Sequence, residues 1–350
     1  MLPKTTKIGL LSPITWPIPP VAYGAWETVV TNLARGLVKK GYTDITLFAT
    51  KQAAIPGVKT VGFLDQPLGT HPKAGARAYE LEQARFAIAE ADRLKLDVLH
   101  NHFNYPPLLF QQASSTPMVT TLHGSAIEPD ALAAYQLYRH KPYVSISNAE
   151  RSFAPDLNYL ATVYNAIDTT TFVYQPQPGS YLVQTGRIHP TKGVHQAIRL
   201  AKAVKRSLYL AGPIENDQQT YFDEQIKPFI DGVNVIYLGN ISPLEVAKLV
   251  SHAYAFVALI DWEEPFGLSV VEAMACGTPV IGMRRGAQVE TILEGETGLL
   301  VSSVEEAIER FSEVERIDRA QCSDKTVKCF SIDAMTDGYL AVYERLLSSN

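Results

Sequence analysis

The chain has 350 residues, of which 46% are hydrophobic and 19% charged, and a formal net charge of −5. The length is about twice that of a typical domain and predicts two of them, and the composition is ordinary for a globular protein. The negative charge argues against a general nucleic-acid binder, which needs clustered lysine and arginine, and no apolar run approaches the roughly 20 residues of a membrane span.

The N-terminal stretch is interrupted by Pro13 and Pro17 and does not resemble a signal peptide. The three cysteines, Cys276, Cys322 and Cys329, form neither a disulfide framework nor a zinc-binding pattern. We therefore expect a cytoplasmic protein with reduced thiols.

Short apolar runs alternate with amphipathic stretches in the first half of the chain. Residues 24–40 are expected to form a helix, because Val29, Leu33 and Leu37 recur at helical spacing. A second long helix is expected at 73–95. The predicted strands are 7–12, 44–50, 97–102, 117–124 and 142–148, and the segment 161–168 closes this half.

The segment 169–180 has two prolines and no clear periodicity, and we interpret it as a linker. A second alternation follows it. The predicted strands are 181–186, 207–212, 234–239, 254–260, 278–283 and 298–301. The predicted helices are 193–204, 217–230, 243–252, 266–276, 286–294, 304–314 and a last amphipathic one at about 331–347.

Strands that alternate with helices predict right-handed βαβ units and parallel sheets. The expected fold class is α/β, with two Rossmann-like domains facing across a cleft. The expected domains are 1–170 and 171–330, and residues 331–350 form a helix that crosses back towards the first. Ligands of such sheets bind beyond the carboxyl ends of the strands, so the polar residues there are expected to converge on the cleft.

Two glutamates flank the start of an apolar helix in the stretch "EEPFGLSVVEAMACG". Glu264 is expected just outside this helix and Glu272 inside it, on the order of 10 Å apart along the axis. That separation is too long for two carboxylates acting on one bond and fits two contacts to one extended ligand. The backbone amides of Phe266, Gly267 and Leu268 lie between them and suit anionic oxygens. The alternative is a solvated acidic loop.

Two cations follow a predicted strand in "TGRIHPTKG". Arg187 and Lys192, flanked by Gly186 and Gly193, would make a clamp for a diphosphate at a helix start. The alternative is an ordinary βα loop with surface cations. The loop "YGAWE" around Gly24 gives a weaker signal for a phosphate-approach loop.

Histidines stand at the ends of two predicted strands. His123, in "TTLHGS", is expected at a sheet edge facing the cleft, although a lone histidine is more often structural. His100 and His102 alternate along one strand face, but no carboxylate accompanies them at a matching spacing, so no metal site is expected.

Together these motifs resemble the retaining glycosyltransferases of family 4, which have the GT-B fold. The resemblance covers nearly the whole chain. It rests on Glu264 and Glu272 with seven residues between them, on "GRIHPTKG", on "YNAID", on "YGAWE" and on His123-Gly124. It implies a hexosyltransferase that moves a hexose from a nucleotide-diphosphate sugar to a hydroxyl acceptor, with retention of configuration and without a metal or other cofactor.

The resemblance also implies roles for the matching positions. Glu272 would bind the ribose, and Arg187 and Lys192 the diphosphate. Glu264, with the amides of Phe266, Gly267 and Leu268, would hold the sugar, and His123 would lie near the reacting carbon. Gly24 would approach the phosphates or acceptor, and the backbone of Tyr237 and Leu238 would touch the base.

Two positions depart from the family pattern. Ala25 replaces the second glycine of the N-terminal loop, which puts its phosphate contact in doubt, and Ala166 replaces the glycine of the "NGID" motif. Two rival enzymes share the fold, a nucleotide-sugar epimerase and a GT-B-type phosphorylase, but no lysine in a convincing context would hold the phosphorylase's cofactor. A further alternative is a nucleotide-sugar-binding protein without transferase activity.

The acceptor is expected against the N-terminal domain. Its candidate contacts, which could equally fill the domain interior, are Trp16, Tyr23, Trp26, His71, Phe103, Tyr105 and Asn165. The basic patch at the end of helix 24–40 is thin, which favours a small soluble acceptor over a lipid. Backbone contacts do not distinguish uracil from guanine, so the sequence leaves UDP, GDP and ADP donors open. A UDP-sugar such as UDP-glucose is expected as a prior and not from the residues. The sequence indicates no oligomeric state.

Overall fold

The computed structural model describes residues 2–69 and 75–348, so His71 lies outside the described residues. The chain divides into two compact units. Unit 1 consists of Met1–Ala166 and Ile332–Asn350, and unit 2 of Ile167–Ser331. Each unit is an α/β structure around one parallel sheet, which confirms the predicted fold class of two Rossmann-like domains.

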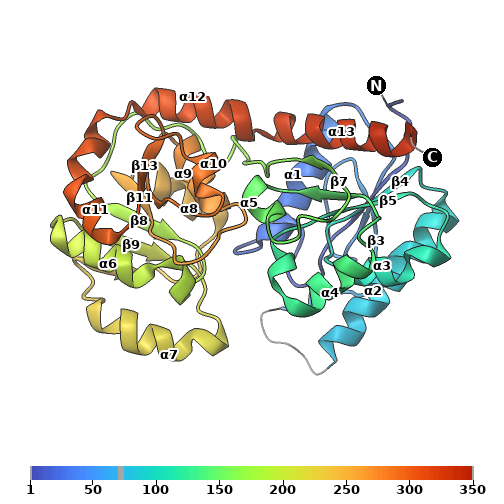
Figure 1. Ribbon diagram of the computed structural model, residues 1–350, viewed down its shortest axis with the longest axis horizontal. Helices are drawn as coiled ribbons and strands as arrows, with labels where there is room; N and C mark the ends of the chain where they lie inside the picture. The colour runs from blue at the N-terminus through green and yellow to red at the C-terminus, as the bar shows by residue number, and fades with distance from the viewer. Residues whose placement is uncertain (1, 70–74, 349–350) are drawn as a thin grey trace. The chain divides into compact units, whose positions relative to one another are not determined.

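Unit 1 contains a seven-stranded parallel sheet in the order β3-β2-β1-β4-β5-β6-β7 (Figure 1). In register, Ile8 of the central strand lies opposite Ile45 on one side and Val98 on the other. The central strands are buried on both faces, which explains their continuous apolar runs. The strands are β1 (Ile8–Leu11), β2 (Ile45–Phe48), β3 (Lys59–Val61), β4 (Val98–Asn101), β5 (Met118–Thr121), β6 (Tyr143–Ser145) and β7 (Tyr159–Thr162).

Helices cover both faces of this sheet. Figure 1 shows α1 and α13 on one face and α2, α3 and α4 on the other. Helix α13 packs against α1 so closely that a Cβ on Gly36 would lie 2.0 Å from the Thr336 hydroxyl oxygen. The helices are α1 (Ala25–Lys39), α2 (Ala76–Leu94), α3 (Pro106–Phe110), α4 (Pro129–Leu137), α5 (Asn148–Arg151) and α13 (Ile332–Ser348).

Unit 2 contains a six-stranded parallel sheet in the order β10-β9-β8-β11-β12-β13. Its strands are β8 (Leu182–Thr185), β9 (Leu208–Ala211), β10 (Val235–Tyr237), β11 (Ala255–Ala258), β12 (Val280–Met283) and β13 (Gly298–Val301). Its helices are α6 (Val194–Ala203), α7 (Gln219–Tyr221), α8 (Pro243–Ser251), α9 (Leu268–Ala275), α10 (Gln288–Thr291), α11 (Val304–Glu309) and α12 (Arg319–Phe330). Helix α8 begins with a capping box between Ser242 and Glu245.

Several elements of unit 2 differ from the sequence prediction. The helix predicted at 304–314 ends at Glu309 as α11 and is followed by a 3-10 helix at Phe311–Arg316. The helix predicted at 217–230 is a short α-helix that continues as a π-helical turn and a 3-10 turn, because Pro228 cannot continue an α-helix. The helix predicted at 286–294 is reduced to α10. Helix α12 was not predicted, since its polar sequence has little hydrophobic periodicity.

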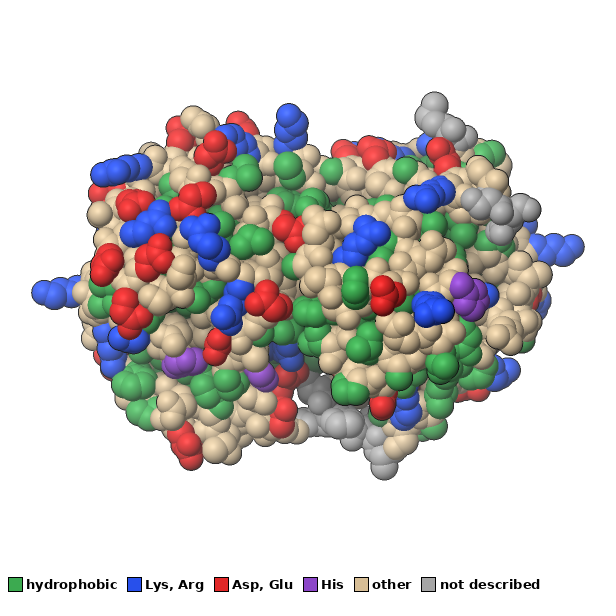
Figure 2. Space-filling model, viewed as in Figure 1, with side chains coloured by type: hydrophobic (Ala, Val, Ile, Leu, Met, Phe, Trp, Pro, Cys, Tyr) green, Lys and Arg blue, Asp and Glu red, His purple; other side chains and the backbone are tan. Residues whose placement is uncertain are grey.

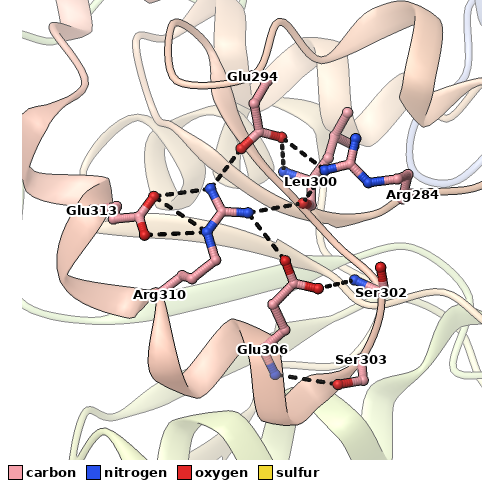
Figure 3. A network of polar contacts seen from close by, with 8 residues as sticks. All are labelled: Arg284, Glu294, Leu300, Ser302, Ser303, Glu306, Arg310 and Glu313. Atoms are coloured by element: carbon pink, nitrogen blue, oxygen red, sulfur yellow. Dashed lines mark hydrogen bonds and ion pairs between the residues drawn. The ribbon is translucent and has the colours of Figure 1, made fainter.

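A cluster of charged side chains covers the edge strand β13 (Figure 3). The Arg310 guanidinium donates to Glu294, Glu306 and Glu313. It also donates to the Leu300 carbonyl oxygen, as does Arg284, while Glu294 accepts from the Leu300 amide. The cluster therefore satisfies backbone groups that an edge strand leaves unpaired.

Charged side chains of both signs are interspersed over the face of the molecule shown in Figure 2, without a large patch of one sign. No helix among the described residues is both long and apolar enough to cross a bilayer.

Candidate functional site

In unit 2, the order of the strands reverses between β8 and β11, and the loops that follow these two strands, together with helix α9, hold most of the predicted donor-binding residues. Parallel sheets bind ligands at this point, because the crossovers leave to opposite sides and open a crevice. The loop after β8 carries Arg187 and Lys192. The loop after β11 carries Glu264 and leads into α9.

These two loops meet in an ion pair. The ammonium group of Lys192 donates to Oε2 of Glu264, and the Trp262 indole donates to the same oxygen at 3.2 Å. The Lys192 nitrogen also lies 4.9 Å from the centre of the Trp262 ring, a cation–π distance. The lysine and glutamate side chains are only 21% and 11% exposed, so this pair is largely shielded from water.

The backbone holds this lysine in place. Gln184 donates to the Lys192 carbonyl oxygen at 2.6 Å. The next residue, Gly193, has a φ of 66° and packs against the residue that follows β11. A Cβ on Gly193 would lie 1.7 Å from the Leu259 carbonyl oxygen. Only glycine fits this contact. Glycine is needed at position 193 because the two loops approach each other closely there.

The acids before α9 separate into two groups by burial. Asp261 and Glu263 are exposed and contact Arg285 and the Gly286 amide, with an Asp261–Arg285 distance of 2.7 Å. Glu264 is 9% exposed and turns towards Lys192. The alternative of a solvated acidic loop therefore describes the first two acids and not the third.

Arg187 also faces a carboxylate. Its Nη1 lies 2.9 Å from Oε2 of Glu215, which belongs to the loop after β9. Both predicted clamp cations thus come from the loop after β8, and both are paired with acids of neighbouring loops.

Helix α9 begins two residues later than predicted. Gly267 precedes it with a φ of 85°, a left-handed conformation that favours glycine, and Phe266 is buried. Glu272 is therefore the fifth helical residue, about one turn inside the helix. It is half-buried, and no described residue forms a hydrogen bond or ion pair with its carboxylate. Burial raises its pKa from 4.5 to about 7.

The predicted base contact lies at the end of β10. The amide of Leu238 donates to the Leu210 carbonyl oxygen, so this amide is already used by the sheet. The Tyr237 hydroxyl donates to the Gly212 carbonyl oxygen at 2.7 Å. Tyr237 is thereby fixed to the loop after β9.

In unit 1, His123 follows β5 and is 8% exposed. Its ring stacks on Trp26, with centroids 5.4 Å apart, and its Nε2 lies 2.9 Å from Nδ1 of His102. Trp26, predicted as an acceptor contact, is therefore a direct neighbour of His123.

The N-terminal loop of unit 1 is held by a buried carboxylate. Glu27 in α1 is 2% exposed and accepts from the Trp16 amide at 3.2 Å. Burial raises its pKa to about 7. Gly24 lies between these residues, where a Cβ would contact Pro20 at 3.0 Å, and Trp16 meets Tyr23 edge to face.

The other predicted acceptor residues of unit 1 are less accessible. Phe103 is 5% exposed and belongs to the hydrophobic core, which favours the interior-filling alternative, and its acceptor contact stays a prediction. Asn165 is 3% exposed, and its Oδ1 has no hydrogen-bond partner among the described residues. Tyr105 packs against the same core and bonds to Arg77.

Sequence reasoning missed two features of the site. Glu27 stands in the quoted loop motif, but nothing in the motif indicated that its carboxylate anchors Trp16. His100 and His102 were considered only as metal ligands, although their alternation on one strand face indicated a shared environment. Among residues 2–69 and 75–348, no group of three or more side chains is suited to hold a metal ion.

Comparisons with known proteins agree with these motifs. The family described as glycosyl transferases group 1 matches residues 173–326, and glycosyltransferase family 4 matches residues 26–171. The chain is 24% identical to the glycogen synthase of Mycobacterium tuberculosis over 336 residues, which cover 82% of this chain and 80% of the relative. It is also 24% identical to the putative glycosyltransferase YtcC of Bacillus subtilis, with 85% and 79% covered.

Solved structures share the fold. The sucrose-phosphate synthase of Thermosynechococcus elongatus superposes with a TM-score of 0.80 at 19% identity, covering 99% of this chain and 100% of that one. HepE of Anabaena, solved in complex with UDP-glucose, gives a TM-score of 0.70 at 18% identity, with 98% and 100% covered. With the two family matches, which between them span most of both units, the chain belongs to the group 1, family 4 glycosyltransferases and is a glycosyltransferase enzyme of the GT-B fold.

Proposed function

We propose that this enzyme transfers a hexose from a UDP-sugar to a hydroxyl of a small soluble acceptor, with retention of configuration and without a metal ion. The observation that carries the proposal is the shielded Lys192–Glu264 pair, together with Glu272 one turn inside the helix that follows, whose carboxylate has no hydrogen-bond or ion-pair partner among the described residues. A cation and two carboxylates at the carboxyl edge of a parallel sheet fit one ligand that carries both phosphates and hydroxyls.

The proposed chemistry begins with an exchange of partners. Lys192 leaves Glu264 for the donor diphosphate, and the released carboxylate accepts hydrogen bonds from hexose hydroxyls. Arg187 and Lys192 then stabilise the charge that develops on the leaving phosphate, which is the task a divalent cation performs in other transferases. Glu272 binds the ribose hydroxyls, and His123 binds a hydroxyl of the hexose.

The donor class is supported by similarity. HepE, which shares the fold, was solved with UDP-glucose, and the relatives include a glycogen synthase. A thermal-shift screen of UDP-, GDP- and ADP-glucose tests the donor, since a ligand at about 100 times its dissociation constant adds about 2.7 kcal/mol of stability. No stabilisation by any of the three would refute the proposed donor site.

The reaction itself is tested with purified enzyme, UDP-glucose and a panel of sugar acceptors. We expect the product to be an α-glycoside by NMR and its rate of formation to be unchanged by EDTA. A β-linked product would contradict retention, and loss of activity in EDTA that returns with Mg²⁺ would contradict metal independence. Release of free UDP-sugar epimer without transfer would instead favour an epimerase.

A further inference from the structure

The three histidines at the carboxyl ends of β4 and β5 form one hydrogen-bonded chain. Nε2 of His123 lies 2.9 Å from Nδ1 of His102, and Nε2 of His102 lies 3.2 Å from Nδ1 of His100. His100 and His102 are fully buried, and only His123, at the outer end, is 8% exposed. The spacing of these nitrogens is that of hydrogen bonds and leaves no room for a bridging metal ion.

The inner end of the chain fixes the direction of these bonds. Nε2 of His100 lies 2.7 Å from the Thr121 hydroxyl, and that hydroxyl donates its proton to the Tyr339 hydroxyl at 3.2 Å. A hydroxyl has a single proton, so Thr121 must accept from His100, whose proton is therefore on Nε2. Nδ1 of His100 is then an acceptor, and the Tyr343 hydroxyl lies 2.7 Å from it.

The donor at one end of this hydrogen-bonded chain determines the donor in each following bond, because each histidine ring is neutral. Burial lowers the pKa of all three histidines, that of His123 to about 3. A neutral imidazole has one N–H and one lone pair. If His102 had its proton on Nδ1, its Nε2 lone pair would face the lone pair of His100. Its proton is therefore on Nε2, its Nδ1 accepts, and His123 must donate from Nε2.

We propose that Thr121, His100 and His102 are positioning residues that fix the proton of His123 on Nε2, so that Nδ1 of His123 is a hydrogen-bond acceptor for the ligand. None of the described residues bonds to this Nδ1. The inference rests on the proposed function for the identity of the ligand. An acceptor nitrogen binds a sugar hydroxyl and repels a phosphate or carboxylate oxygen, so His123 selects for the uncharged part of the donor or acceptor.

The experiment is a long-range ¹H–¹⁵N NMR correlation on the full-length protein labelled at histidine, which reports which ring nitrogen bears the proton. In the free wild-type protein we expect His123 to be protonated on Nε2. A proton on Nδ1, or a doubly protonated ring at pH 7, would overturn the proposal whether or not the protein has the proposed activity.

Two substitutions of buried residues that hardly change side-chain size distinguish a role in positioning His123 from a role in packing. Thr121→Val removes the group that accepts from His100, so we expect a measurable fraction of His123 to move its proton to Nδ1. Tyr343→Phe removes a hydroxyl that only donates, so we expect the wild-type tautomer. If the tautomer of His123 were unchanged in both variants, Thr121 would not set it. If Thr121→Val did not fold, the wild-type spectrum would still show which nitrogen of His123 carries the proton, and so which residue donates in each hydrogen bond.

Activity provides the second readout. We expect Thr121→Val to lower kcat/KM about tenfold, the size of one hydrogen bond, and Tyr343→Phe to lower it much less. Adding UDP-glucose to the wild-type protein should move the ¹⁵N resonance of His123 Nδ1. If the tautomers are as expected but UDP-glucose moves no resonance of the protein, the proposed function fails while the positioning chain stands.

Discussion

The ammonium group of Lys192 is paired with the carboxylate of Glu264, although the two residues are 72 positions apart in the sequence. Each was expected to bind a different part of the donor, and in the free protein each neutralises the other. If both groups bind the donor as proposed, donor binding separates a shielded ion pair, and the donor replaces both halves of it. This exchange prepares the two groups without leaving either charge unpaired in the absence of substrate.

Removing the lysine tests this exchange. We expect Lys192→Ala to weaken UDP-glucose binding by at least about tenfold and also to destabilise the free protein, because Glu264 loses its cationic partner in a shielded position. Isothermal titration and urea unfolding measure the two effects. Lys248→Ala, an exposed lysine on α8 of the same unit, is the control and should change neither. Unchanged donor affinity in Lys192→Ala would disprove the diphosphate clamp.

Glu272 predicts a pH dependence of stability. Its pKa rises from 4.5 to about 7 on folding, so the folded protein binds more protons than the unfolded chain between these values. The free energy of unfolding should therefore fall as the pH rises through this window. Glu272→Gln removes the penalty, and we expect it to stabilise the free protein by about 1–3 kcal/mol at pH 8 and hardly at all at pH 4.

Urea unfolding at both pH values measures this effect, with Glu309→Gln, an exposed acid on α11, as the control. The same Glu272→Gln protein should bind UDP-glucose more weakly, because glutamine loses the charge that strengthens hydrogen bonds to hydroxyls. A variant that is less stable at pH 8 would show that the carboxylate is satisfied in the free protein.

His123→Ala should lower turnover more than donor binding. The imidazole is expected to bind a hexose hydroxyl as the bond to phosphate breaks, so kcat should fall by about tenfold or more while the dissociation constant of UDP-glucose changes little. Steady-state kinetics and titration give the two numbers. The exposed His140 on the same unit is the control, and His140→Ala should behave as wild type. Equal losses in binding and turnover would instead indicate a contact that is equally strong in the donor complex and in the transition state.

The cluster around Arg310 predicts a contribution to stability away from the site. Arg310→Met removes one donor from Glu294, Glu306, Glu313 and the Leu300 carbonyl oxygen, while Arg284 still contacts Glu294 and that carbonyl. We expect a loss of about 1–2 kcal/mol in unfolding free energy. The control is Arg199→Met, whose pair with Glu305 is more than half exposed on both sides and should contribute less than the cluster does. Equal effects of the two variants would mean that the cluster adds nothing beyond a surface pair.

The sequence predicted the strands well because parallel strands buried on both faces have continuous apolar runs that end in polar residues. Lys192 and Glu264 could be named for the same reason, since each follows such a run. Helix α12 could not, because its polar residues lack a clear period and its stability comes from packing against α9. The break at Pro228 was visible in the sequence and was not used.

The partners of the site residues were beyond sequence reasoning. Nothing local to His100 shows that Tyr343, 243 positions later, would reach its ring. Glu27 illustrates the same limit, because the motif gives its position but not the bond to the Trp16 amide. Such contacts depend on tertiary packing, which periodicity and spacing do not encode.

The place of α13 in unit 1 has a consequence for synthesis on the ribosome. Unit 2 is continuous from Ile167 to Ser331, so all of its residues are available before α13 emerges. Unit 1 begins earlier and finishes later, because Tyr339 and Tyr343 supply hydroxyls to its buried interior. During translation the first 166 residues therefore cannot complete the fold of unit 1. The face of α1 that packs against α13 stays uncovered until α13 has been synthesised.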